Sequence, residues 1–346
     1  MPPSEVHPPK SVAVVGAGSW GTALAHLLAS KGYEVRIWGR DADVVESLNR
    51  RHTTKYLPGV NIHPSLRATG ELTEAVRGAS MVVGAVPSQF TRNVFEQVRD
   101  HLSHDAIVVI ASKGIETTTL MTMSEVMQDV LPFERHGRLC FISGPSFALE
   151  VARGFPTVVT VAGENPRIAR TVQHWFHAPS FRVYTSYDVV GVELGGALKN
   201  VIAIAAGALE GIGAGNNIQA ALITRGIAEM TRLGIKRGAN PLTFAGLTGM
   251  GDLILTCTGQ LSRNRSVGLR LGRGDKIDGI LKGMDQVAEG VETSRSAYML
   301  AQKESVELPI MEQVYRVLHE GKEIRQAIQD IMARELKAEL DYLTSG

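Results

Sequence analysis

The chain has 346 residues, of which 44% are hydrophobic, and its 36 Lys and Arg nearly balance its 35 Asp and Glu. This length predicts two domains that each bury a core, and the balanced charge excludes a global attraction to nucleic acid. The two cysteines, Cys140 and Cys257, are too few for a disulfide framework or a metal cluster, so we expect a reducing compartment.

The first half of the chain follows a proline-rich N-terminus, residues 1–10, which lacks the apolar region of a signal peptide and is expected to be a disordered tail. Continuous apolar strands then alternate with helices, which predicts a doubly wound, mostly parallel sheet. The expected strands are residues 11–15, 33–38, 81–86, 106–111, 139–143, 157–161 and 181–184. The expected helices are residues 19–30, 43–51, 93–102, 120–130 and 167–176.

Strand signals disappear from about residue 189. Long helical stretches follow, interrupted by glycine-rich loops at 211–215, 246–251 and 272–274, and the last helix is expected over 324–343. The sequence therefore predicts an α/β Rossmann-type doubly wound domain over 11–188 and an all-α domain over 189–346.

Residues 190–209 carry only two charges, Glu193 and Lys199. The stretch is long enough to span a membrane, but the Lys199–Asn200 pair at its middle and the lack of a second such stretch favour a helix buried in a domain core. A lysine there is costly without a reason. A catalytic lysine and a lysine that snorkels to solvent fit this segment equally well. On a helix its face neighbours would be small or apolar and would leave room for a ligand: Gly195, Gly196, Ile202 and Ala203.

A glycine-rich loop follows the first predicted strand and opens the first predicted helix. It reads Gly16-Ala-Gly18-Ser-Trp-Gly21, which is the G-x-G-x-x-G motif in the context that it requires. Gly16 would make the tight turn, Gly18 would let the backbone approach a pyrophosphate, and Gly21 would pack helix on strand. We therefore expect this domain to bind a dinucleotide at a helix N-terminus.

The end of the second predicted strand bears on the choice of cofactor. NAD-specific sites usually place an acid there, but this chain has Gly39 followed by Arg40. Arginine suits a 2′-phosphate, so NADP is favoured over NAD, with NAD not excluded. Asp41 comes after the strand and suits a helix N-cap better than a ribose contact.

Further candidate residues lie in loops after other strands and in the helical half. Lys113, Gly144 and Ser146 follow predicted strands, whose carboxyl ends share one edge of the sheet. In the helical half, Asp252 follows a flexible glycine pair and could hold the Lys199 ammonium; a helix N-cap for residues 253–256 is its other expected role, and the two roles are compatible. A plausible phosphate clamp opens a helical run: Ser262, Arg263 and Asn264.

These segments together resemble the bacterial NAD(P)-dependent glycerol-3-phosphate dehydrogenases over nearly the whole chain. The segments that carry the resemblance are residues 15–24, 112–114, 142–148, 195–205, 249–258, 262–265 and 286–290. The resemblance implies a second domain like that of 6-phosphogluconate dehydrogenases. It also implies reversible reduction of dihydroxyacetone phosphate to sn-glycerol 3-phosphate for phospholipid synthesis, by a cytoplasmic and typically dimeric enzyme.

By the same resemblance, Lys199 is the proton donor and acceptor, assisted by Lys113 and Asp252. The implied substrate contacts are Lys113, Gly144, Ser146, Lys199, Asp252, Ser262, Arg263 and Asn264. The implied cofactor contacts, beyond the three motif glycines, are Ser19, Trp20, Arg40, Lys113, Ala148, Arg263, Val287 and Glu289.

Two other functions remain open from the residues. A β-hydroxyacid dehydrogenase such as one acting on 6-phosphogluconate also combines a Rossmann domain, a helical domain and a lysine, but its asparagine typically lies four residues after that lysine, where this chain has Ala203. A non-catalytic dinucleotide-binding sensor would explain the glycine loop but would not require Lys199, Asp252 and an anion clamp together. The scattered histidines, including His174 and His177, show no metal-ligand spacing, so no metal is expected.

Overall fold

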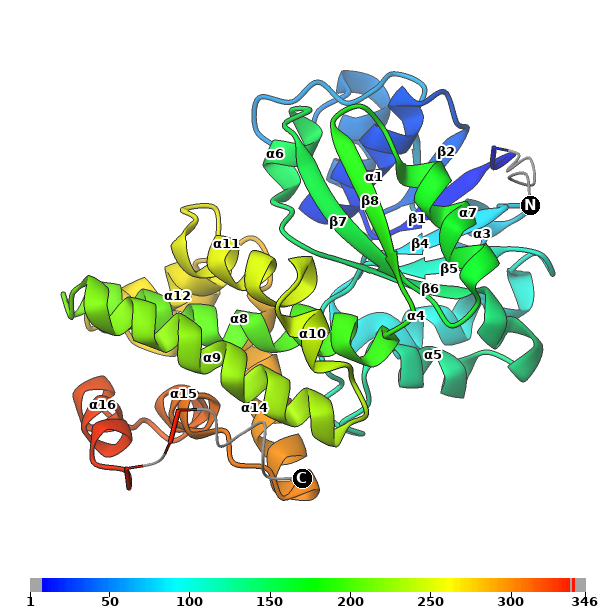
Figure 1. Ribbon diagram of the computed structural model, residues 1–346. Coiled ribbons are helices and arrows are strands. Elements are labelled where there is room, and N and C mark those ends of the chain that lie inside the picture. Colours follow the sequence, from blue (N-terminus) through cyan, green and yellow to red (C-terminus); the bar gives the residue numbers. More distant parts are fainter. Residues whose placement is uncertain (1–7, 337, 340–346) are drawn as a thin grey trace. The chain divides into compact units, whose positions relative to one another are not determined.

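The structure is a computed structural model that describes residues 8–336, 338 and 339 (Figure 1). The described chain forms two compact units. Unit 1 contains the residues up to Lys113 together with Met123–Val189, and unit 2 contains Gly114–Thr122 together with the residues from Val190 onward. Each unit is described by itself.

Unit 1 is built on an eight-stranded sheet in the order β3-β2-β1-β4-β5-β6-β7-β8. Neighbouring strands are parallel except β6 and β7, which confirms the mostly parallel, doubly wound sheet. β1, β4, β5 and β6 are buried along their whole length, which explains their continuous apolar sequences. The strands are β1 (Val12–Val15), β2 (Val35–Trp38), β3 (Arg67–Thr69), β4 (Met81–Gly84), β5 (Ile107–Ile110), β6 (Leu139–Ser143), β7 (Thr157–Ala162) and β8 (Phe181–Ser186).

The helices of unit 1 form two groups (Figure 1). α1 packs against both α6 and α7, and α4 packs against both α3 and α5. The α-helices are α1 (Ser19–Ser30), α2 (Ala42–Glu46), α3 (Leu72–Val76), α4 (Thr91–Val98), α5 (Met123–Val130), α6 (Ala148–Ala152) and α7 (Pro166–Phe176). Shorter helical turns are η1 (Ser47–Arg51), η2 (Ser88–Phe90), η3 (Arg99–His101) and η4 (Phe133–Arg138).

The strand order of unit 1 reverses at β1, which pairs with β2 on one side and with β4 on the other. In open α/β sheets, ligands bind outside the carboxyl ends of the strands at such a switch point. The glycine loop follows β1 directly, so the fold places this loop where a dinucleotide is expected.

Unit 2 is helical, with one isolated bridge between Ile115 and Thr122 among its described residues. Its long helix α8 is apolar enough to cross a membrane by length and composition, and 83% of its most apolar window is buried in the structure, as in a core helix. The helices are α8 (Val189–Gly211), α9 (Asn216–Lys236), α10 (Pro241–Phe244), η5 (Leu247–Gly251), α11 (Asp252–Thr258), α12 (Arg263–Gly272), α13 (Ile277–Lys282), α14 (Glu289–Glu304), α15 (Pro309–His319) and α16 (Ile324–Met332).

Helices α8 and α12 touch through glycines. A Cβ atom at Gly207 would lie 2.0 Å from the carbonyl oxygen of Arg265, and one at Gly268 would lie 1.9 Å from that of Ile204. Both positions exclude any side chain, because such separations are far below contact distance. The backbones of the lysine helix and of α12 therefore pack directly against each other.

Several expected boundaries differ from the structure. The short elements β3 and α3 were not predicted, because a three-residue strand has little periodicity to detect. The helix expected over 120–130 begins at Met123, because Leu120 has a left-handed φ of 62° that cannot continue a helix. The last helix ends at Met332 rather than at residue 343; residues 337 and 340–343 of that expectation, and residues 1–7 of the expected tail, lie outside the described residues.

The segment Gly114–Thr122 belongs to unit 2, although the sequence placed it in the first domain. Ile115 is fully buried in the hydrophobic core of unit 2, and Leu120 packs against that core. The chain therefore leaves unit 1 directly after Lys113 and returns to it at Met123.

Candidate active site

The glycine loop of unit 1 has the geometry of a dinucleotide-binding turn. Gly16 has a φ of +117°, and a Cβ atom there would lie 2.8 Å from the carbonyl oxygen of Ala85 after β4. A Cβ atom at Gly21 would lie 1.9 Å from the carbonyl oxygen of Gly16, so both glycines are sterically required. Gly18 is the N-cap of α1, and a Cβ atom built there would have no neighbouring atom within 4 Å. The N-terminus of the helix is therefore accessible to a pyrophosphate.

The start of α1 also carries an unused donor. The indole Nε1 of Trp20 is buried and has no hydrogen-bond partner among the described residues. Buried polar groups normally have partners, so this nitrogen is available to a bound group. The residues present thus fit a dinucleotide at this turn.

At the end of β2, the Asp41 side chain accepts a hydrogen bond from the backbone N–H of Asp43 at 3.1 Å, so the predicted N-cap role is confirmed. Its other carboxylate oxygen accepts a bond from Lys55 Nζ at 2.9 Å. Arg40 is exposed, and no hydrogen bond or ion pair joins it to the rest of the described chain.

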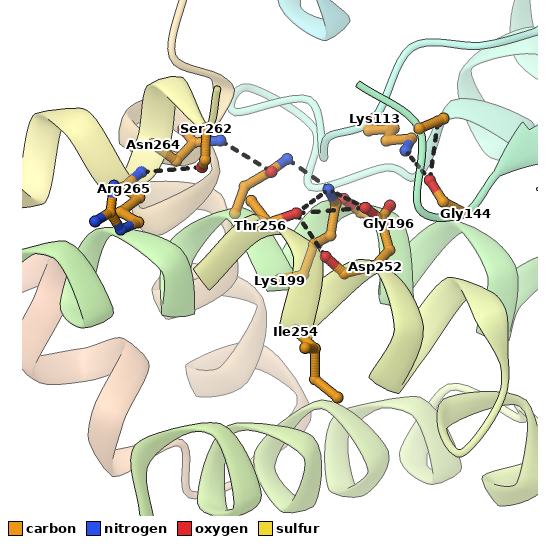
Figure 2. A network of polar contacts seen from close by, with 12 residues as sticks. Lys113, Gly144, Gly196, Lys199, Asp252, Ile254, Thr256, Ser262, Asn264 and Arg265 are labelled. Carbon is orange, nitrogen blue, oxygen red and sulfur yellow. Dashed lines mark hydrogen bonds and ion pairs between the residues drawn. The ribbon is translucent and has the colours of Figure 1, made fainter. Parts of the chain in front are cut away.

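Two predicted residues of unit 1 converge on one carbonyl oxygen (Figure 2). Lys113 Nζ donates to the carbonyl oxygen of Gly144 at 3.1 Å, and Ser146 Oγ donates to the same oxygen at 2.9 Å. Gly144 has a φ of +135°, and a Cβ atom there would lie 3.0 Å from Val159 Cα, so only glycine suits this turn. Ala148 begins α6, which packs against α1.

Lys199 of unit 2 lies in a buried polar network (Figure 2). Its Nζ donates to Asp252 Oδ1 at 2.7 Å and to Thr256 Oγ1 at 2.7 Å. Thr256 Oγ1 in turn donates to the backbone oxygen of Asp252 at 2.6 Å. The side chain of Lys199 is only 7% exposed, so the alternative that it snorkels to solvent is wrong.

Asp252 is the first residue of α11, and the N-cap is Gly251, so the expected N-cap role of Asp252 is wrong. The carboxylate points toward Lys199 instead, with its side chain 2% exposed. A buried ion pair gives a large penalty when one partner is removed, because the other charge is then left uncompensated. The pair therefore keeps a cation in an apolar core.

Sequence reasoning missed Thr256. It lies four residues after Asp252 on the same helix, and residues at this spacing share a helix face. That spacing was the available signal. A second side chain of α11 that contacts Lys199 must project from the same helix face as Asp252, and Thr256 does.

The small face next to Lys199 is not open at every position. A Cβ atom at Gly195 would lie 2.7 Å from the carbonyl oxygen of Thr248 in η5. The expectation that this face leaves room for a ligand is therefore wrong at Gly195, where the backbone of η5 fills the space. This close approach brings the turn before Asp252 against α8.

A second buried chain of hydrogen bonds starts at the next residue of α8. Asn264 Nδ2 donates to Asn200 Oδ1 at 2.9 Å, and the backbone N–H of Gly290 donates to Asn264 Oδ1 at 2.9 Å. Asn200 Nδ2 donates to the backbone oxygen of Gly196 at 3.3 Å. These bonds fix the orientation of the Asn264 amide and connect α8, α12 and the start of α14.

The remaining predicted residues of unit 2 gather around the N-terminus of α12. Ser262 caps that helix by accepting a bond from the backbone N–H of Arg265 at 3.2 Å. Arg263 is exposed and donates through Nη1 to the backbone oxygen of Val287 at 2.7 Å. Glu289 is the first residue of α14. The structure thus brings Arg263 and Val287 into direct contact.

Other chemistry is limited within the described residues. No group of three or more His, Cys, Asp or Glu side chains there could hold a metal ion. Burial raises the pKa of the Cys140 and Cys257 thiols to about 12, so neither thiol ionises near neutral pH.

A cavity of about 210 Å³ among α8, α9, α15 and α16 has an almost wholly aliphatic lining, which does not suit a phosphorylated substrate.

Comparison with known proteins decides the family. The sequence profile described as the NAD-dependent glycerol-3-phosphate dehydrogenase N-terminus matches residues 11–169, and the profile of the C-terminus of the same family matches residues 188–329. The chain belongs to the NAD-dependent glycerol-3-phosphate dehydrogenase family. Family membership favours this dehydrogenase function over the 6-phosphogluconate-type and sensor alternatives.

Individual members of the glycerol-3-phosphate dehydrogenase family match the chain along its length. Glycerol-3-phosphate dehydrogenase [NAD(P)+] of Syntrophotalea carbinolica is 55% identical over 332 residues, which are 96% of this chain and 100% of that protein. The Myxococcus xanthus protein of the same name is 54% identical over 328 residues, 94% of this chain and 98% of that one. The crystal structure of glycerol-3-phosphate dehydrogenase from Coxiella burnetii superposes with a TM-score of 0.89 at 37% identity, and covers 94% of this chain and 99% of that one.

Proposed function

We propose that this chain reduces dihydroxyacetone phosphate reversibly to sn-glycerol 3-phosphate, with NADPH preferred over NADH. The observation that carries the proposal is the buried Lys199 ammonium, held by Asp252 and Thr256 in a chain of this family. Both the [NAD(P)+] relatives and the dinucleotide-binding geometry of the glycine loop support the cofactor class.

Lys199 acts as the proton donor in reduction and as the proton acceptor in oxidation. When bound, the nicotinamide supplies the hydride to the carbonyl carbon, and the carbonyl oxygen gains negative charge. The ammonium of Lys199 stabilises that charge and transfers a proton to the oxygen. Its bonds to Asp252 Oδ1 and Thr256 Oγ1 direct two of its three donors and so orient the group before substrate binds.

Proposed substrate contacts come from both units, each by its own geometry. In unit 1 these are Lys113, Gly144 and Ser146. The side chains of Lys113 and Ser146 both donate to the Gly144 carbonyl oxygen. In unit 2 they are Ser262, Arg263 and Asn264, at the N-terminus of α12, where backbone N–H groups and a guanidinium favour a phosphate. Asn264 offers its remaining amide hydrogen, because its Nδ2 already donates the other one to Asn200 Oδ1.

The proposed cofactor contacts include the glycine loop with Ser19 and Trp20, and Arg40 for a 2′-phosphate. The other proposed contacts are Lys113, Ala148, Arg263, Val287 and Glu289. We further propose that the enzyme is a cytoplasmic homodimer that supplies glycerol 3-phosphate for glycerophospholipid synthesis.

The testing experiment follows the absorbance of NADPH or NADH with dihydroxyacetone phosphate and, separately, with 3-oxo acids. We expect turnover of dihydroxyacetone phosphate with both cofactors. At low cofactor concentration the rate should be higher with NADPH than with NADH. We expect no turnover of 3-oxo acids. Turnover of a 3-oxo acid alone would support the β-hydroxyacid alternative. Tight NADPH binding without turnover of either substrate class would support the sensor alternative.

Catalysis by Lys199 is tested separately with Lys199→Ala. This variant should lose turnover while its NADPH affinity stays that of the parent chain. Near-normal turnover in the folded variant would refute the role of Lys199 and leave the substrate assignment to the first assay.

A further inference from the structure

The end of β2 carries an arrangement of charges that bears on cofactor choice. In a Rossmann-type sheet the adenosine ribose lies beside the end of this strand, where an acid binds the ribose hydroxyls of NAD and a cation accommodates the 2′-phosphate of NADP. Here β2 ends at Trp38 and is followed by Gly39, Arg40 and Asp41.

Position 39 has no space for an acid. A Cβ atom at Gly39 would lie 2.8 Å from the Cβ atom of Ala17 and 3.4 Å from Val45 Cγ2. Ala17 lies between Gly16 and Gly18 of the glycine loop, so it cannot shift away without distorting the pyrophosphate turn. The backbone of this chain therefore excludes a ribose-binding carboxylate at position 39.

The carboxylate of Asp41, two residues later, is already engaged on both oxygens. Oδ1 caps α2 through the backbone N–H of Asp43, and Oδ2 accepts the bond from Lys55 Nζ at 2.9 Å. The hydrogen bond from Lys55 lowers the pKa of Asp41, so the pair is ionic at neutral pH. Lys55 comes from the loop after η1, fourteen residues away in sequence.

Two cations thus accompany one carboxylate at this strand end. Arg40 adjoins Asp41 in sequence and is exposed, and Lys55 is bonded to it with a side chain 56% exposed. Together the three side chains carry one net positive charge. A phosphate monoester such as the 2′-phosphate carries about −1.5 to −2 at neutral pH, so it gains from both cations and is repelled by Asp41 wherever Lys55 does not neutralise that carboxylate.

We propose that Lys55 is a determinant of NADP preference. It neutralises Asp41, which would otherwise repel a 2′-phosphate and accept a hydrogen bond from a ribose 2′-hydroxyl, and it offers its ammonium as a second cation beside Arg40. This inference deepens the NADPH preference proposed above and does not depend on the identity of the second substrate.

The experiment measures binding to the full chain without turnover. NADPH, NADH, 2′,5′-ADP and 5′-AMP are titrated by calorimetry into the parent chain, into Lys55→Met and into a matched control, Lys303→Met, which removes an exposed lysine of α14 in unit 2. Loss of one charge-assisted contact should raise the Kd of Lys55→Met about tenfold for NADPH and for 2′,5′-ADP. The Kd values for NADH and 5′-AMP should not rise by more than about twofold, because the freed Asp41 carboxylate can accept a hydrogen bond from the ribose. Lys303→Met should match the parent for all four ligands.

A second background separates neutralisation of Asp41 from direct contact. Asp41→Asn removes the charge and keeps an N-cap residue for α2. In this background Lys55→Met should cost only about threefold in NADPH affinity, because no carboxylate remains to repel the phosphate. An unchanged tenfold loss would refute the neutralising role.

Two further results would overturn the proposal. Equal weakening of NADPH and NADH would mean that Lys55 supports the loop rather than the 2′-phosphate, and unchanged NADPH affinity would mean that it does neither. Circular dichroism of each variant checks that unit 1 is folded. Because no readout uses dihydroxyacetone phosphate, failure here is distinguishable from failure of the proposed reaction.

Discussion

Replacing Asp252 by asparagine removes the charge that accompanies Lys199 while keeping a side chain of the same shape. The Nζ and Oδ1 atoms are 2.7 Å apart, and the two side chains are 7% and 2% exposed. With an effective dielectric constant of about 20, charges at this distance attract by about 6 kcal/mol. Desolvation of the pair offsets part of that, and loss of one partner of a buried pair typically costs about 3–5 kcal/mol.

We therefore expect Asp252→Asn to lower the free energy of unfolding by about 3–5 kcal/mol near neutral pH. The loss should shrink as pH rises, because a neutral amine in the variant no longer needs a counter-ion. The same reasoning predicts an effect on catalysis. Without the carboxylate the ammonium loses its proton at lower pH, so the alkaline limb of the reduction profile should move to lower pH, while oxidation, which needs the free amine, suffers less.

Urea unfolding at several pH values and pH–rate profiles in both directions measure these two effects. Asp275→Asn is the control, because Asp275 pairs with Arg270 at 2.7 Å with side chains 47% and 41% exposed. An exposed pair contributes at most about 1 kcal/mol, so this control should stay close to the parent. An Asp252→Asn variant that matches Asp275→Asn in stability and keeps the parent pH profile would refute the reasoning.

Three further predictions test other parts of the structure. Thr256→Val removes the oxygen that Lys199 contacts at 2.7 Å and should lower kcat about tenfold without changing the Kd for NADPH; Thr256→Ser should restore most of the kcat, and an unchanged kcat in Thr256→Val would exclude a positioning role. Burial raises the pKa of Glu229 to about 7 from its usual 4.5, so the unfolded chain ionises first and stability should fall by up to about 3 kcal/mol between pH 4.5 and 7. Glu229→Gln should flatten this dependence in urea unfolding, and an equal slope in both chains would contradict the assignment. Gly268→Ala should lower stability by at least about 3 kcal/mol in thermal unfolding, because its Cβ would lie 1.9 Å from a backbone oxygen, whereas Gly279→Ala, with open space around it, should be neutral or slightly stabilising.

Local patterns in the sequence predict much of the fold. The apolar run at 190–209 is long and nearly uncharged, so a buried helix is the only soluble structure that suits it, and α8 is found there. The antiparallel direction of β7 could not be predicted, because a buried strand has the same local pattern whichever way it runs in the sheet. The placement of Gly114–Thr122 in unit 2 depends on which core buries Ile115, and no property of the segment itself decides that.

The candidate site also contains residues that local sequence patterns reveal and residues that they do not. Lys199 is conspicuous because its charge lies in an apolar helix, and Asp252 could be suggested as its partner because it follows glycines that permit close approach. The contact between Asn200 and Asn264, 64 residues apart, has no local signature. Each amide alone resembles an ordinary polar residue, and only the packing of α12 on α8 makes them partners.

The glycine contacts between α8 and α12 have a mechanical consequence. Helices separated by large side chains can slide by changing rotamers, but helices whose backbones touch have no such freedom. Gly207 and Gly268 therefore lock the lysine helix to α12, whose N-cap is Ser262 and whose first turn carries Arg263 and Asn264. The distance between Lys199, the proposed proton donor, and the proposed anion-binding end of α12 is thus a constant of unit 2, and any motion that accompanies substrate binding must carry both together.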